Sequence, residues 1–145
     1  MRTTWIRYCH RVPNVTLIRS NDLAETPGYA YASAVAPGTR LIHLAGSCPL
    51  DTDGTVTLVG DYAGQAAKCI ENLTSALAAA GGSLVDVAYT RVLVATLRNE
   101  DLGTVWNIVR ESFAAHEVPS TLFGVTALGY SNQLVEIEAI AAVAE

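Results

Sequence analysis

Two predicted helices, each apolar along one side only, constrain the fold of this chain more than any other feature. Helical spacing runs through residues 61–80, where the repeating apolar positions are Tyr62, Ala66, Ile70, Leu73 and Leu77. A second helix is expected to start at Asn99 or Asp101 and to end near His116, with the stripe Leu102, Val105, Trp106, Val109 and Phe113. Because a helix with one apolar stripe buries that stripe against another layer, both helices need a partner on one side only.

Strand patterns lie before, between and after these helices. Residues 29–35 alternate, Pro37-Gly38 marks a tight turn, and residues 40–46 are predicted to complete a hairpin. Further strands are predicted at residues 84–97, which are rich in β-branched side chains, and at 15–20, 120–127 and 134–143. From residue 29 the order is β-β-α-β-α-β-β, which favours an α+β fold with two helices packed on one face of a mixed sheet.

The composition indicates one globular domain and disfavours several functions. Of the 145 residues, 50% are hydrophobic and only 16% are charged, so part of the surface is expected to be buried in an oligomer. The net charge is −5 and no run of Lys or Arg exists, which argues against binding to nucleic acid. Residues 1–28 are interpreted as an irregular N-terminal extension of the domain, and residues 29–145 as its regular part.

The cysteines and the apolar segments point to the compartment. Cys9, Cys48 and Cys69 are an odd number without a Cys-x-x-Cys pair, which is typical of reduced thiols rather than of a disulfide framework. The sequence has no apolar segment of signal-peptide or membrane-spanning length. We therefore expect a soluble, cytoplasmic protein that does not contact a membrane.

Several short motifs, in this order, resemble one known family. The segments are YASAV, LAGSCPLD, Asn72-Leu73 in the first helix, AGGSLVDV, PST and VEIEAIA, and the resemblance covers roughly residues 29–143. In this order and spacing they resemble the Rid/YjgF family. The resemblance implies a chorismate-mutase-like fold and a barrel-like homotrimer with clefts between neighbouring subunits. It also implies hydrolysis of small reactive imines or enamines without a metal or another cofactor.

The chain departs from the family where the substrate carboxylate is bound. The deaminases of the family carry an arginine immediately before the serine of the segment that matches PSTLFGV, and this chain has Pro119 there. Guanidinium binds a carboxylate through two parallel hydrogen bonds, whereas proline has neither a charge nor an N–H group. The departure puts the usual deaminase activity in doubt, unless a cation such as Arg91 or Arg40 takes over; the alternative is that both are ordinary solvated residues.

Glu136 is the candidate catalytic residue, because the resemblance aligns it with the glutamate that positions or activates the attacking water. A carboxylate near the imine carbon can accept a proton from water. Glu136 and Glu138 are two residues apart, so both are expected on the same face of a strand. The alternative is that Glu136 belongs simply to the polar face of the sheet or to a subunit contact.

The candidate substrate-binding residues are Tyr31, Gly46, Ser47, Pro119, Ser120 and Thr121. Tyr31 matches a tyrosine at the cleft rim, and Gly46 lets a substrate approach the backbone. Ser47 stands where the family prefers an amide side chain. For each of these residues packing, a bulge or the start of a strand remains the alternative. Trp106, Cys48 and His43 are interpreted as structural, and the three histidines have no metal-ligand spacing.

These observations leave two main hypotheses about function. The first is an enzyme that adds water to a small imine, enamine or related carbonyl compound in clefts between subunits. The second is a trimer that binds or senses a small molecule without catalysis, which the missing arginine favours. Ribonuclease activity, a third possibility within the family, is disfavoured by the negative net charge.

Overall fold

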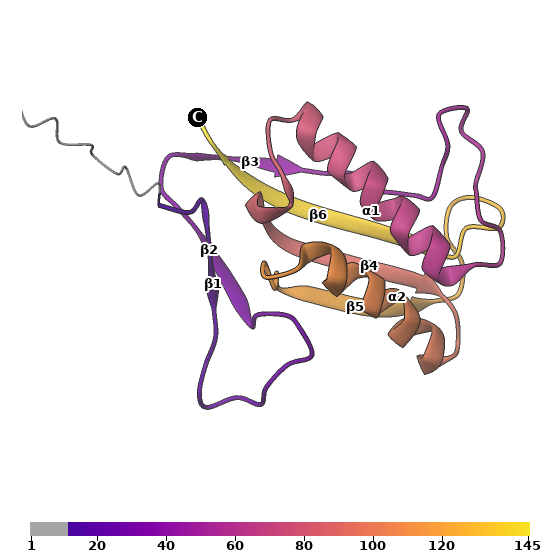
Figure 1. Ribbon diagram of the computed structural model, residues 1–145, viewed down its shortest axis with the longest axis horizontal. Coiled ribbons are helices and arrows are strands. Elements are labelled where there is room, and N and C mark those ends of the chain that lie inside the picture. The colour runs from indigo at the N-terminus through magenta and orange to yellow at the C-terminus, as the bar shows by residue number, and fades with distance from the viewer. Residues whose placement is uncertain (1–11) are drawn as a thin grey trace, which may run out of the picture.

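Two helices lie side by side on one face of a four-stranded sheet (Figure 1). The structure is a computed structural model that describes residues 12–145. The helices are α1 (Tyr62–Ala79) and α2 (Asn99–Phe113). The strands, in spatial order, are β3 (Thr39–His43), β6 (Val135–Ala144), β4 (Val87–Ala95) and β5 (Ser120–Val125). Since β4 and β5 are parallel and the other pairs are antiparallel, the predicted α+β fold with a mixed sheet is confirmed.

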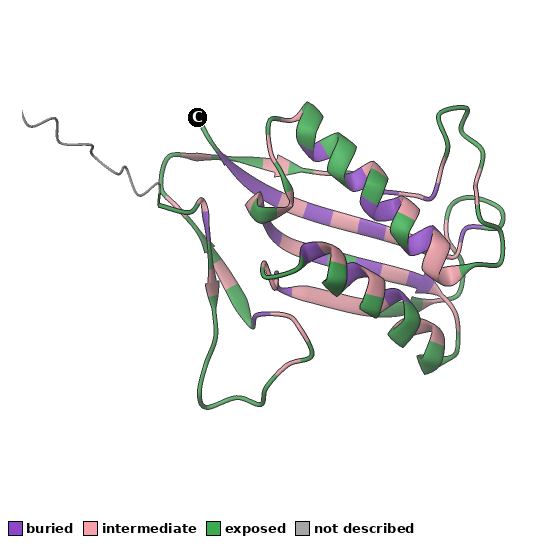
Figure 2. Cartoon of the chain, viewed as in Figure 1, coloured by how far each residue is buried: buried purple, intermediate pink, exposed green. Residues whose placement is uncertain are grey.

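The core lies between the sheet and the helices, as the apolar stripes predict. Leu73 and Leu77 of α1 and Val105 of α2 are fully buried. Along β6, alternate residues from Val135 to Ala141 are buried, and Figure 2 shows this alternation as bands on the strand beneath the helices. The strand therefore presents one face to the core and leaves the other to solvent or to a partner.

The predicted limits hold for α1 but only in part for α2. The Asp61 side chain accepts a hydrogen bond from the Gly64 N–H at 2.9 Å, and Gly81 follows the helix at φ 83°, so both predicted ends are confirmed. The predicted cap of α2 was wrong. Arg98 precedes the first turn and makes no side-chain cap, and the Asp101 carboxylate accepts a hydrogen bond from the Thr96 hydroxyl at 2.6 Å.

The predicted hairpin of residues 29–46 was also wrong, although the chain does turn at Gly38, with φ 75°. Strand β2 (Ala32–Val35) pairs with β1 (Val15–Ile18), whereas β3 pairs with β6. Pairing with β6 places Ile42 of β3 against the core, an apolar contact that a local hairpin would not provide. The two arms of the expected hairpin therefore belong to different sheets.

The strand predicted at residues 84–97 begins later than expected, because residues 84–86 have another structure. They form a 3₁₀ turn instead of the start of a strand. The Ser83 backbone N–H and hydroxyl both donate to the Asp86 carboxylate, at 2.9 and 3.0 Å, and this local capping competes with strand pairing.

The face of the sheet turned away from the helices is only partly covered. The β1–β2 hairpin covers one end through a small cluster of Val15, Ala88 and Ala142. Leu41 and Phe123 remain 49% and 42% exposed on this face. We call it the open face.

The predicted boundary between residues 28 and 29 stays a prediction, and Cys9 and His10 lie outside the described residues. No helix within residues 12–145 is long and apolar enough to cross a membrane.

Candidate functional site

Glu136 lies on the open face near the start of β6, where it contacts the nearby Gln133 and also Cys48 and Gly46, which are distant in sequence. Its Oε2 accepts a hydrogen bond from Gln133 Nε2 at 3.0 Å and lies 3.6 Å from the Cys48 sulfur. Gln133 Nε2 also lies 3.2 Å from Cys48 Sγ. With Gly46, these residues form what we call the carboxylate cluster. The carboxylate is held in one orientation, as a group that positions water requires.

Gly46 makes room for the Glu136 carboxylate. The chain pairs with β6 through Leu44 opposite Ala139 and Ser47 opposite Ile137, so it bulges between these two contacts. A Cβ atom at position 46 would lie 1.8 Å from Glu136 Oε1. The glycine is therefore required by the approach of the carboxylate.

Ser47, a predicted substrate-binding residue, has its backbone hydrogen-bonded to β6. It is buried, and its N–H and carbonyl are both paired with Ile137, at 2.8 and 3.1 Å. Its backbone N–H is therefore already engaged, and only its side chain remains as a candidate contact.

Two buried glutamines that the sequence reasoning did not single out hold the loop before β6. Gln133 is 4% exposed, and its Oε1 accepts from the Tyr130 N–H at 3.0 Å. Gln65 of α1 is fully buried; its Nε2 donates to the Asn132 carbonyl at 2.9 Å and its Oε1 accepts from the Leu134 N–H at 2.7 Å. For Gln65 the signal in the sequence was a polar amide next to the apolar stripe of the helix, which has to find buried partners, whereas Gln133 follows the polar Ser131-Asn132 and carried no such signal.

Cys48 remains a thiol in this cluster. Burial, and secondly the nearby Glu136 carboxylate, raise the pKa of the Cys48 thiol to about 11. A thiol at neutral pH is a weak nucleophile, so Cys48 is not suited to covalent catalysis. The interpretation of Cys48 as a structural residue agrees with this chemistry, although its contact with Glu136 was not foreseen.

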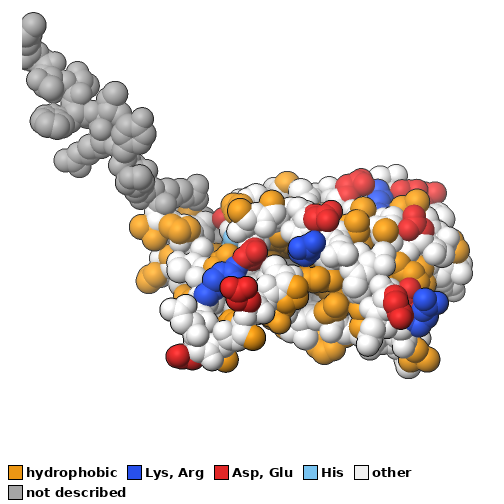
Figure 3. Space-filling model, turned by 60° about the horizontal axis from the view of Figure 1, so that its bottom comes forward, with side chains coloured by type: hydrophobic (Ala, Val, Ile, Leu, Met, Phe, Trp, Pro, Cys, Tyr) orange, Lys and Arg blue, Asp and Glu red, His pale blue; other side chains and the backbone are white. Residues whose placement is uncertain are grey.

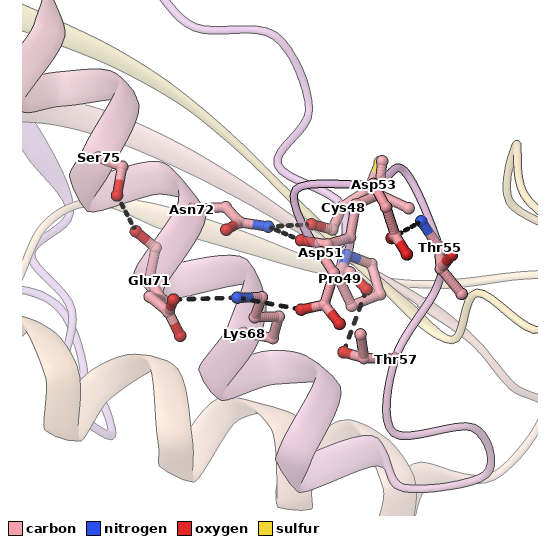
Figure 4. A network of polar contacts seen from close by, with 11 residues as sticks. Cys48, Pro49, Asp51, Asp53, Thr55, Thr57, Lys68, Glu71, Asn72 and Ser75 are labelled. Carbon is pink, nitrogen blue, oxygen red and sulfur yellow. Dashed lines mark hydrogen bonds and ion pairs between the residues drawn. The ribbon is translucent and has the colours of Figure 1, made fainter.

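The segment that carries Cys48 is tied to α1, as Figure 4 shows. Asn72 Nδ2 donates to the carbonyls of Cys48 and Leu50, both at 2.9 Å. Lys68 of the same helix lies 3.6 Å from the Asp51 carboxylate. These contacts fix the backbone of the loop and with it one wall of the carboxylate cluster.

A second group of candidate residues surrounds a hollow of about 350 Å³ at the free edge of β5. We call it the aromatic pocket; it is lined by Pro27, Tyr29, Trp106, Ser120, Thr121 and Leu122. The rings of Tyr29 and Trp106 meet edge to face, with centroids 6.0 Å apart. Trp106 packs against the core, as predicted, but it also forms one wall of this pocket.

The polar residues of this region are engaged within the chain. Ser120 Oγ donates to the Val118 carbonyl at 3.0 Å, and Thr121 Oγ1 lies 2.7 Å from the Tyr89 hydroxyl. Pro119 is buried, and its carbonyl accepts from the Thr90 N–H at 3.0 Å. The side chain at position 119 therefore does not extend into the hollow.

Tyr31 lies next to the aromatic pocket but does not line it. Its hydroxyl donates to the Ala24 carbonyl at 2.5 Å, and its ring meets Tyr29 edge to face at 6.4 Å. Tyr31 supports the loop that carries Tyr29, and its predicted role in substrate binding stays a prediction.

Within one chain the structure does not bring the carboxylate cluster and the aromatic pocket together. Glu136 pairs with Leu93, and Ser120 with Thr90, so the two positions differ by three residues along β4. That separation alone is roughly 10 Å along the strand. The Glu136 side chain also faces the open side, whereas Ser120 contacts the fully buried Thr90, 2.7 Å away. Of the predicted site residues, Glu136 and Gly46 lie in the carboxylate cluster and Ser120 and Thr121 line the aromatic pocket, whereas Tyr31 and Pro119 belong to neither.

Neither candidate replacement for the missing arginine lines the aromatic pocket. Arg91 forms an ion pair with Glu138 on the open face. Arg40 donates to the carbonyl of Ala80, at the C-terminal end of α1, at 3.4 Å, and neither arginine belongs to the lining of the pocket. The pairing also shows that Glu136 and Glu138 share one face, as predicted. Among residues 12–145, no three His, Cys, Asp or Glu side chains are grouped so that they could hold a metal ion.

Comparison with known proteins agrees with this architecture. Residues 23–143 match the family described as Endoribonuclease L-PSP. The chain is 33% identical over 112 residues to the 2-iminobutanoate/2-iminopropanoate deaminase of Rattus norvegicus, covering 77% of this chain and 79% of that protein. It is 30% identical over 108 residues to the 3-aminoacrylate deaminase RutC of Acinetobacter baylyi, covering 72% of this chain and 83% of that protein.

A solved structure supports the same fold. A protein of unknown function from Yersinia pestis, YyfB of the conserved Rid family, superposes with a TM-score of 0.84 at 24% identity, over 90% of this chain and 99% of that chain. The chain therefore belongs to the Endoribonuclease L-PSP family, which includes the Rid proteins, and the resemblance drawn from the sequence is confirmed.

Proposed function

We propose that this protein hydrolyses a small imine or enamine to a carbonyl compound and ammonia. The observation that carries the proposal is the Glu136 carboxylate, fixed by Gln133 and placed directly against Gly46. Its support from comparison is that relatives about 30% identical are named as deaminases of imino acids and of aminoacrylate.

The chemistry proceeds by addition of water to the C=N bond. Glu136 accepts a proton from water while the oxygen attacks the imine carbon, and the π electron pair of the C=N bond moves to nitrogen. Transfer of that proton to nitrogen gives a neutral carbinolamine, which carries one hydroxyl and one NH₂ group on the same carbon. The hydroxyl proton then moves to the NH₂ group, with Glu136 as the carrier, while the C–N bond breaks and the C=O bond forms, so the products are the carbonyl compound and ammonia.

The reaction site is proposed to lie between two copies of the chain. The carboxylate cluster and the aromatic pocket are separate within one chain, and contact between copies would bring one of each together. The exposed Leu41 and Phe123 on the open face are apolar surface that a homotrimer would bury. A trimer of this 15.3 kDa chain has a mass of three times that value, about 46 kDa, which light scattering after size-exclusion chromatography measures directly.

A pair of matched variants tests the activity. Imines are generated in situ by an amino-acid oxidase or a flavin amine oxidase, and release of ammonia is compared with that in buffer. We expect Glu136→Gln to lower kcat by 100-fold or more and Glu138→Gln to change it little, because both carboxylates share one face but only Glu136 lies against Gly46. No acceleration by the wild-type protein with either kind of imine would refute the hydrolase.

The alternative is a trimer that binds a small molecule without catalysis. Pro119 in place of the arginine favours it, because the usual charged anchor for a substrate is missing. Ligand binding that persists in a protein with no turnover, and that Glu136→Gln leaves unchanged, would support this alternative against the hydrolase.

Cleavage of RNA, which the family description mentions, is less compatible with this chain. The net charge is −5, and no Lys or Arg side chain lines the aromatic pocket. An RNA-cleavage assay with Glu136→Gln as control tests this possibility.

A further inference from the structure

We infer that the aromatic pocket binds an uncharged, flat group of the ligand, so that the preferred substrates are neutral aromatic or apolar imines rather than imino acids. The inference rests on the proposed function for the reaction, but the binding preference follows from the pocket itself. Four of its six lining residues, Pro27, Tyr29, Trp106 and Leu122, present apolar or aromatic surface. A hollow of about 350 Å³ accommodates a single ring.

The pocket has no charge to offer an anion. Its lining contains no Asp, Glu, His, Lys or Arg side chain. Arg110 is one helical turn beyond Trp106, but it lines a separate hollow that also contains Glu111 and Glu117. Its Nε donates to Asn107 Oδ1 at 3.2 Å. Arg19 donates to the Tyr29 carbonyl at 3.4 Å, but it forms an ion pair with Glu117 and does not line the pocket. A carboxylate entering the aromatic pocket would therefore lose water without gaining a cation from the lining.

Most hydrogen-bond donors of the pocket already donate to acceptors within the chain. Trp106 Nε1 donates to the Pro27 carbonyl at 2.8 Å. Since Ser120 donates to the Val118 carbonyl, the Thr90 hydroxyl is the donor in the 2.7 Å contact between Thr90 and Ser120. Ser120 thus presents only an acceptor to a ligand.

The side-chain donors that remain are two neutral hydroxyls, of Tyr29 and Thr121. Thr121 is free to donate when the Tyr89 hydroxyl donates to it, since either atom can be the donor of that pair. One or two neutral hydroxyls match a carbonyl or an imine nitrogen, but they do not replace the paired donors of a guanidinium. Position 119 adds nothing, because proline has no N–H group.

The test compares benzamide with benzoate, which have the same shape and differ in charge. Dissociation constants are measured on the full-length protein by ligand-observed NMR titration. We expect benzamide to bind at least tenfold more tightly than benzoate, because its carbonyl accepts one hydrogen bond and its NH₂ group donates to the Ser120 oxygen. Equal or tighter binding of benzoate, or no binding of benzamide, would overturn the inference.

Variants locate the binding. Trp106→Leu is expected to weaken benzamide binding at least fivefold, and Leu97→Ala, which removes a side chain that is 95% exposed outside the pocket, is expected to leave it unchanged. If Trp106→Leu does not fold, Tyr29→Ala in the preceding loop serves the same purpose. Unchanged binding in the folded pocket variant would place benzamide elsewhere and overturn the inference.

A kinetic comparison separates this inference from the proposed function. Benzylamine with a flavin amine oxidase yields a neutral aromatic imine, and phenylglycine with an amino-acid oxidase yields the same ring with a carboxylate. Faster hydrolysis of the neutral imine supports both conclusions. Faster hydrolysis of the imino acid keeps the hydrolase and overturns the neutral pocket. Selective benzamide binding without hydrolysis of either imine keeps the pocket and overturns the hydrolase.

Discussion

The carboxylate cluster and the aromatic pocket differ in how they use polar groups. In the cluster, the buried Gln133 amide and the Cys48 thiol both contact one acidic side chain on the open face, that of Glu136. In the pocket, the hydrogen bonds of Trp106 and Ser120 are made to backbone carbonyls of the same chain, and what faces the hollow is mainly ring surface. The two regions therefore differ in what they offer a ligand, an oriented carboxylate in one and apolar ring surface in the other, and we expect that each can be changed without the other.

The largest expected effect comes from closing the space in the cluster. Gly46→Ala would bring a Cβ atom within 1.8 Å of Glu136 Oε1 and force the carboxylate away. We expect imine hydrolysis to fall at least 100-fold and the free energy of unfolding to fall by about 1–3 kcal/mol. Gly103→Ala in α2, whose added Cβ would contact nothing within 4 Å, is the control and is expected to be neutral or stabilising. Wild-type rates in Gly46→Ala would show that Glu136 does not need its observed position.

The thiol of the cluster should be nearly inert near neutral pH. With a pKa raised to about 11, Cys48 at pH 8 is about 100-fold poorer in thiolate than an ordinary cysteine. Alkylation by iodoacetamide, followed by mass spectrometry in a Cys9→Ser background, is therefore expected to be slow and to rise with pH up to about 11. Rapid alkylation of the folded protein at pH 8 would contradict the burial described for this thiol, and unfolding in denaturant should abolish the protection.

Removal of the Gln133 amide is expected to disturb the orientation of the Glu136 carboxylate less than Gly46→Ala does. Gln133→Leu removes the donor to Glu136 and leaves the Tyr130 N–H without its acceptor. We expect kcat to fall roughly tenfold, with little change in KM, and the free energy of unfolding to fall by about 1–3 kcal/mol. Chemical denaturation and steady-state kinetics on the same preparation measure both. A change in KM alone would assign Gln133 to binding rather than to positioning of the acid.

The smallest effect is expected in the aromatic pocket. Tyr29→Leu removes the edge-to-face contact with Trp106, which is worth about 0.5–1.5 kcal/mol. We expect a few-fold weaker affinity for benzamide and no change in the alkylation rate of Cys48, because the Cys48 thiol is protected by burial and by Glu136 and Gln133 of its own chain. A faster alkylation of Cys48 in this variant would show that the regions are coupled.

The sequence predicted the regular layer of the fold better than the pairing of its strands. The stripes of α1 and α2 and the alternation of β6 are set by local periodicity, and the structure confirms them. The partner of β2 and β3 was predicted wrongly, because the Pro37-Gly38 turn signal acts locally while β3 gains its apolar contact from the distant β6. The sequence also contained a local signal for the 3₁₀ turn, the capping box of Ser83 and Asp86, but the β-branched residues that follow led to the prediction of a strand from residue 84.

By itself, the sequence determined the family, the two helices, the position of Glu136 on one face of its strand and the absence of an arginine at position 119. Only the tertiary structure decided which side chains meet. Gln133 lies 85 residues from Cys48 in sequence, and Trp106 lies 79 residues from Pro27, yet each pair is in hydrogen-bond contact. Contacts over such separations depend on the packing of whole layers, which periodicity along the chain does not specify.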